Sequence, residues 1–330
     1  MQVIDLIRYN HVVRALYLDA MAKLPWCEVV APRGLSYDCM RDVFLHLTYV
    51  EEWVACALSE KPLKWAPPDF NVYQDFGSLK KYMLHVQAKT ETYLAQLSSE
   101  ELNRQIDVFW SQVPNAKVTV ETRLTSIVME DMIHYGELSA SFWQMGLESP
   151  YWGYWRYKVQ HPETSGDLQV TDLIRYNHLV RGLYFDAFAK LPWDEVAANK
   201  GLSFDSMRNV FLHLTLVEDR WISFIIPGRF KEWVNPDFDA FKDMATLKKY
   251  MQRVKENTEN YLATLSAEDL SREIVVPWGD KPNTKISIET GLTHMVIEDM
   301  IHYGELSAAL WQMDLEAPYM GFWRYKHQNP

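Results

Sequence analysis

The chain has 330 residues, of which 48% are hydrophobic and 23% are charged, a balance that excludes disordered and fibrous proteins. Its net charge of −11 argues against binding to nucleic-acid phosphates. The sequence contains no run of about 18 apolar residues, so we expect no membrane span. The first residues lack the pattern of a secretory signal, and all three cysteines fall in the first half, so we expect a cytoplasmic protein without a shared disulfide framework.

The sequence contains a tandem duplication of one long segment. Residues 5–29 match residues 172–196 at 20 of 25 positions, and residues 130–162 match residues 298–330 at 25 of 33 positions. The offsets of 167 and 168 residues are too long for the unit of a solenoid, so each copy is predicted to be a domain. We predict domains at residues 1–162 and 168–330, joined by a polar linker between His161 and Val170.

Four amphipathic helices are predicted in each copy. In the first copy, the first helix ends before a proline and the second follows a serine that we expect to cap it. Alternating β-branched residues between the third and fourth helices predict either a short hairpin or an irregular excursion. Long connections after the second and third helices predict an all-α protein made of two tandem four-helix bundles. The predicted helices are Val3–Leu24, a second helix that follows its N-cap Ser36 and ends at Leu58, Ser78–Leu97 and Glu121–Gly146.

The nine residues EDMIHYGEL begin at Glu130 and again at Glu298. Glu130 and His134 are four residues apart and therefore share one helical face, whose small and apolar neighbours direct it to the core. A carboxylate in a core is costly unless it is paired or bound to metal. A third ligand must come from another helix, and His46 in the second helix is the natural candidate. The two predicted triads are His46, Glu130 and His134, and His213, Glu298 and His302.

Three protein ligands leave coordination positions open, as in catalytic zinc sites, and the same set suits nickel or non-haem iron. The alternative is that the histidines are core residues satisfied by hydrogen bonds and that Glu130 is a surface residue paired with a Lys or Arg. A di-iron site is excluded by ligand count, because each bundle offers a single D-x-x-H pair, Asp131 to His134 in the first copy.

Four further residues have more than one interpretation. Glu137 and Glu305, three residues after the last histidine of each triad, are candidate catalytic residues: either a general base to a water on the metal or a carboxylate that orients the histidine. The alternative to both of these roles is a plain surface or interhelix glutamate. His11 either faces the same cavity or is structural. His294, four residues before Glu298, either adds a nitrogen ligand to the second site or is a partly buried bystander; the first copy has Ser126 there.

The sequence resembles the DinB/YfiT superfamily, whose members are regarded as metal-dependent enzymes. The resemblance covers nearly the whole of each copy and is carried by DLIRYNH, FLHLTYVEEW and HYGEL. It implies a four-helix bundle with a metal held by one residue of the second helix and two of the fourth, which fall on His46, Glu130 and His134. Most members have histidine at the middle position, but the mycothiol-dependent maleylpyruvate isomerase branch is similar in having Glu there.

The resemblance also bears on partners. It implies a small-molecule substrate and a low-molecular-weight thiol, although Tyr135 stands where many members have a basic residue, and a second bundle replaces the C-terminal domain of the isomerase branch. Members commonly form homodimers, so the chain resembles a fused dimer with a pseudo-two-fold axis. The aromatic and basic tails YWGYWRYK and YMGFWRYK either stack single-stranded bases or pack between the bundles, and the acidic net charge favours packing.

These features predict a metal-dependent enzyme that carries out thiol-dependent transfer, isomerisation or hydrolysis. A non-catalytic metal-binding or stress-related protein is the alternative, and a paired bundle without metal is a third.

Overall fold

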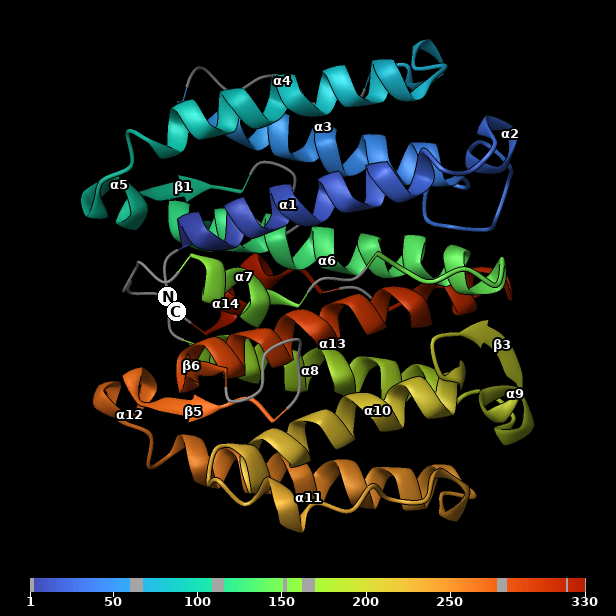
Figure 1. Cartoon of the computed structure of the whole chain (residues 1–330), viewed down its shortest axis with the longest axis vertical. Helices are drawn as coiled ribbons and strands as arrows, with labels where there is room; N and C mark the ends of the chain where they lie inside the picture. Colours follow the sequence, from blue (N-terminus) through green and yellow to red (C-terminus); the bar gives the residue numbers. More distant parts are fainter. Residues whose placement is uncertain are drawn as a thin grey trace.

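The computed structural model describes residues 3–59, 68–108, 116–150, 153–161, 170–277, 284–318 and 320–329. Two bundles of four long helices lie one above the other, and both chain ends lie near the boundary between them (Figure 1). In the first bundle the long helices are α1, α3, α4 and α6; in the second they are α8, α10, α11 and α13. The predicted linker falls almost wholly outside the described residues.

The first bundle contains all the predicted helices and some short ones. Its elements are α1 (Val3–Met21), α2 (Trp26–Val29), α3 (Met40–Ser59), the 3-10 helix η1 (Phe70–Val72), α4 (Phe76–Leu94), α5 (Ser99–Asn103), β1 (Gln105–Asp107), β2 (Lys117–Thr119), α6 (Val120–Gln144) and α7 (Tyr154–Gln160).

The second bundle repeats this order with local changes. Its elements are α8 (Val170–Phe188), α9 (Trp193–Ala197), β3 (Asn199–Leu202), β4 (Asp205–Ser206), α10 (Met207–Arg220), the π-helix η2 (Trp221–Ile225), the 3-10 helices η3 (Phe230–Glu232) and η4 (Phe238–Ala240), α11 (Met244–Leu262), α12 (Ala267–Ser271), β5 (Glu273–Val275), β6 (Lys285–Ser287), α13 (Ile288–Trp311) and α14 (Phe322–Gln328). Among the described residues, no helix has both the length and the apolar character needed to cross a membrane.

Of the two structures predicted between the third and fourth helices, the hairpin is the one observed, in both copies. Strands β1 and β2 pair antiparallel, with Ile106 opposite Val118, and β5 and β6 repeat this pairing with Ile274 opposite Ile286. The hairpin ends where α6 begins, because the side chain of Thr119 accepts a hydrogen bond from the backbone of Thr122 and so caps the helix.

The prediction that Ser36 caps the second helix is wrong. Helix α3 begins only at Met40, and both the backbone N–H and the hydroxyl of Ser36 donate to the carboxylate of Glu137 instead. In the second copy the cap of α10 is Ser206, whose hydroxyl accepts from the backbone of Asn209. The loop before the second helix is therefore drawn towards the fourth helix of its own bundle.

The two bundles meet along α6 and α13 (Figure 1). The closest approach is between Gly136 and Gly304: a Cβ on either glycine would lie 1.8 Å from a carbonyl oxygen of the other helix, Ile301 or Ile133. Only glycine fits at this crossing, so the Gly of each HYGEL segment is required by helix packing. The contacts are reciprocal between the copies, as at an isologous two-fold interface.

The aromatic tails form the short helices α7 and α14, and each contacts both bundles. Helix α7 packs against α13 and α14 packs against α6, while Tyr9 of α1 makes an edge-on contact with Tyr154, at 5.2 Å between ring centroids. Lys158 pairs with Asp5 at 2.8 Å. The tails therefore pack between the bundles, in agreement with the packing interpretation.

Candidate metal centre

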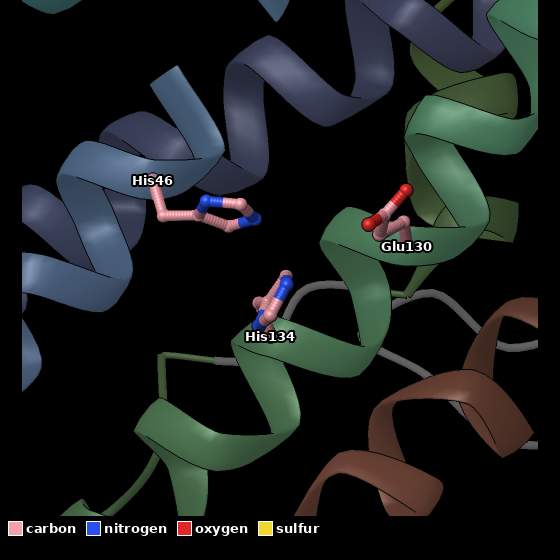
Figure 2. A group of neighbouring side chains, drawn as sticks. All are labelled: His46, Glu130 and His134. Carbon is pink, nitrogen blue, oxygen red and sulfur yellow. The ribbon is translucent and has the colours of Figure 1, made fainter. Parts of the chain in front are cut away.

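The predicted triads come together in both copies. One potential ligand atom from each of His46, Glu130 and His134 lies within 4.8 Å of the others, and the same holds for His213, Glu298 and His302. Figure 2 shows His46 reaching from α3 towards Glu130 and His134, which project from successive turns of α6. The four-residue spacing on α6 and the packing of α3 against α6 produce this arrangement.

The two histidines of the first triad are shielded from solvent, with 7% of His46 and 9% of His134 exposed, whereas Glu130 is half-buried. Burial and the neighbouring His134 lower the pKa of His46 to about 3. Burial and His302 likewise lower the pKa of His213 well below its ordinary value. Both residues are therefore neutral near pH 7, which is the protonation state of a histidine that binds metal.

The candidate catalytic residue Glu137 lies behind the triad. Its side chain is fully buried, and one carboxylate oxygen accepts a 2.5 Å hydrogen bond from Nδ1 of His134. The other oxygen accepts hydrogen bonds from the backbone N–H of Ser36, at 3.1 Å, and from its hydroxyl, at 2.6 Å. This bond to Nδ1 leaves Nε2 as the ring nitrogen available to a metal.

The second copy repeats this arrangement with one bond fewer. Nδ1 of His302 lies 2.9 Å from Oε1 of Glu305, and the backbone of Ser203 donates to the other oxygen at 3.0 Å. Burial, the largest single effect, opposes the charge on His134 and on His302. The neighbouring carboxylates, led by Glu137 and Glu305, together outweigh burial and raise the pKa of each ring.

Aromatic rings cover the histidine of the second helix in each copy. The ring of Tyr37 stacks on His46, with centroids 4.1 Å apart and planes 21° apart, and Phe204 stacks on His213 at 4.0 Å and 22°. These rings belong to the loops that also carry Ser36 and Ser203. Sequence reasoning missed this role, although the repeated segments GLSYD and GLSFD were a signal for it.

His11 does not join the triad. Its Nε2 lies 2.8 Å from Oε1 of Glu51, and the same glutamate pairs with Arg14, which also pairs with Asp131 at 2.6 Å. All four side chains are buried. Asp131 is therefore engaged by this charged network and is not one of the residues grouped in the triad.

A cavity of about 880 Å³ opens between α1 and α4 and is lined in part by His11, Met83 and Glu91. None of the triad residues lines it. His11 therefore lines a cavity that the metal ligands do not share, contrary to the first interpretation of this residue. It belongs instead to the charged network with Glu51.

The match to known families agrees with this geometry. The model of the DinB family matches residues 1–165 and again residues 163–329. The chain belongs to the DinB family. The resemblance seen in the sequence is thus confirmed for both copies, and each DinB unit contains one His/Glu/His group that could hold a metal ion. A search of the curated proteins finds no match.

Proposed function

We propose that this DinB-family chain is a metal-dependent enzyme with one mononuclear site in each bundle. The observation that carries the proposal is the hydrogen bond from Nδ1 of His134 to the buried Glu137, repeated between His302 and Glu305. A carboxylate in this position fixes the tautomer and orientation of a metal-binding histidine. Two imidazoles and one carboxylate suit a divalent zinc, nickel or iron ion.

A divalent ion held by His46, Glu130 and His134 would supply Lewis-acid activation of a substrate oxygen, a water or a thiol. The protein's own groups have distinct roles. Glu137 and Glu305 are buried and already hydrogen-bonded to the triad histidines, which supports a positioning role over that of general base. Tyr37 covers one side of the first site and Phe204 covers the same side of the second. Substrate would therefore approach each site from the side of its half-buried glutamate, Glu130 or Glu298.

We propose a small-molecule substrate, with a low-molecular-weight thiol as the co-substrate to test first. Thiol-dependent transfer, isomerisation and hydrolysis all need a polarised substrate atom and are compatible with the same ligand set. The reciprocal contact of α6 with α13 supports the proposal that the chain works as an intramolecular pseudo-dimer, with both sites on one chain.

Cobalt substitution tests whether the sites have an open coordination position. Protein loaded with Co²⁺ is titrated with a small monothiol and, separately, with azide, and its visible spectrum is recorded. The proposal predicts a saturable change in the cobalt bands, with a thiolate charge-transfer band for the thiol. The His46→Ala/His213→Ala variant is the control and should show neither change.

A non-catalytic metal-binding protein is the second candidate function, and one observation favours it: the triad joins α3 to α6, so a bound ion would tie these helices together. In that case the ion would raise the melting temperature, but the cobalt spectrum would not respond to thiol or azide.

A further inference from the structure

The two candidate metal sites differ in a buried residue beside the ligating glutamate. His294 lies one helical turn before Glu298 on α13, is 3% exposed, and places Nε2 3.2 Å from Oε2 of Glu298. In the first copy this position is Ser126, whose hydroxyl donates at 2.7 Å to the carbonyl oxygen of Thr122 in its own helix. Glu130 therefore lacks the polar contact that Glu298 has.

The His294 ring is confined by two elements. Trp221, at the start of η2, lies edge-on to it with ring centroids 6.0 Å apart, and occupies the space left by Gly291, where a Cβ would lie 2.6 Å from the indole. On another side is Gly153, the N-cap of α7 in the first copy; a Cβ there would lie 3.0 Å from Cε1 of His294. The tail of one copy thus helps to hold a side chain of the other.

His294 contacts the glutamate rather than joining the triad. The donor atoms that lie within 4.8 Å of one another belong to His213, Glu298 and His302, and His294 is not in this group. Its contact with Oε2 leaves the other oxygen of Glu298 for an ion. Polar partners behind a metal-binding carboxylate orient it, and their loss typically weakens metal binding about 10- to 100-fold.

We propose that His294 is a positioning residue of the second metal site, which holds Glu298 in its ligating orientation and makes the two sites of the chain inequivalent. This inference rests on the proposed function, since it requires that the triad binds a metal. Arg220, which replaces Trp53 of the first copy, brings positive charge towards Glu298 and opposes cation binding. The contribution of His294 is therefore measured within the second site, with Arg220 kept in place.

The test uses the full chain with one site removed. In a His46→Ala background the second site alone is titrated with Zn²⁺ or Ni²⁺ against a chromophoric chelator. Adding His294→Ser, which installs the residue of the first copy, should weaken binding about 10- to 100-fold. Adding His294→Gln, which keeps an N–H at similar reach, should restore most of the affinity.

Gly153→Ala tests the contribution of the other copy. The backbone of Gly153, with φ −58°, accepts alanine. The added methyl group would lie 3.0 Å from Cε1 of His294 and 3.2 Å from the indole of Trp155, so it presses on both rings. We expect weaker metal binding at the second site. In a His213→Ala background, where the first site alone is titrated, all three substitutions should leave the affinity unchanged.

Each outcome bears on the inference. Equal affinity in the His46→Ala protein with and without His294→Ser would overturn the positioning role and leave the proposed function standing. A Gln variant as weak as the Ser variant would overturn it too, because it would mean that the imidazole itself ligates the ion or packs against the site. If the His46→Ala protein binds no metal while its fold is intact by circular dichroism, the metal-site proposal for this copy fails along with the inference.

Discussion

The carboxylate of Glu137 connects the candidate metal site to the loop that covers it. One of its oxygens accepts a hydrogen bond from His134 and the other accepts one from Ser36. The next residue, Tyr37, stacks its ring on His46. A single buried charge thus fixes both the histidine ring and the loop. Removing the charge should disturb both at once.

Glu137→Gln together with Glu305→Gln tests this role. Glutamine keeps the size of the side chain but accepts a weaker hydrogen bond from the imidazole, so we expect metal affinity to fall by about 10- to 100-fold at each site. Affinity is measured by chelator competition. Glu100→Gln, at an exposed position of α5, is the matched control and should have no effect. Unchanged affinity in the double variant would contradict the positioning role.

Asp131 and Asp299 give the metal-free protein a distinctive dependence on pH. Burial, only partly offset by Arg14 and Asn10, raises the pKa of Asp131 to about 6, and Asp299 behaves alike. Because the folded state binds this proton more tightly than the unfolded state, the contribution to stability is fully present below pH ~4 and is lost as the pH rises through 6.

Asp131→Asn with Asp299→Asn removes this titration. Between pH 4 and 6, the free energy of unfolding of the wild type should fall relative to the variant by about 1 to 3 kcal/mol per site. Urea unfolding of the metal-free proteins at several pH values gives the difference. A difference that does not change with pH would mean that both carboxyl groups titrate normally.

Among the contacts between helices, the crossing of α6 and α13 is so close that adding one methyl group would disrupt it. Gly136→Ala should force these helices apart, because the new Cβ would meet the carbonyl oxygen of Ile301. Overpacking of this kind costs about 1–3 kcal/mol or more, measured as a fall in the free energy of unfolding.

Gly182→Ala is the matched control. This glycine lies within α8, a Cβ on it would meet nothing within 4 Å, and the first copy has Ala15 at the same place. Alanine there should stabilise the helix by up to about 1 kcal/mol. Equal losses of stability at both glycines would contradict a close helix crossing at Gly136.

The long helices could be predicted from the sequence to within a few residues, because periodic apolar residues and caps act locally. The sequence predicts the first helix as far as Leu24, but the helix ends at Met21, because the next residues form a tighter turn ahead of Pro25. The short helices α5 and α7 were not predicted. Helix α7 has seven residues and is held by Tyr9 and by the other bundle, contacts that no local pattern contains.

The triads could be predicted because a four-residue spacing fixes two ligands on one helix, and because a histidine within an apolar helix stands out. What lies around them could not. The sequence predicts Ser36 as a helix cap, since nothing local shows that its partner is a carboxylate 101 residues away. The four-residue spacing of His294 and Glu298 predicts their contact, but the packing of Gly153 against the His294 ring cannot be predicted because Gly153 belongs to the other copy.

For the whole molecule, the tails make each bundle depend on the other. Trp323 of α14 packs with Val108, Ala116 and Val118, which belong to the hairpin region of the first copy. A residue of the second copy therefore completes a small apolar cluster of the first.

Trp323→Ala should lower the free energy of unfolding by about 3 kcal/mol, since it empties this cluster. It should also speed amide hydrogen exchange in β1 and β2 more than in β5 and β6. Trp155→Ala, the same change in α7, is the counterpart and should act mainly on β5 and β6. Effects of equal size on both hairpins from either variant would contradict the exchange of tails.

The most direct measurement of the central claim is the metal content of the purified, untagged protein beside its His46→Ala/His213→Ala variant. The account predicts close to two divalent transition-metal ions per chain, one for each triad, and none bound in the variant. Absence of metal from the wild type after reconstitution with zinc, nickel and iron would contradict it, and so would equal metal content in the two proteins.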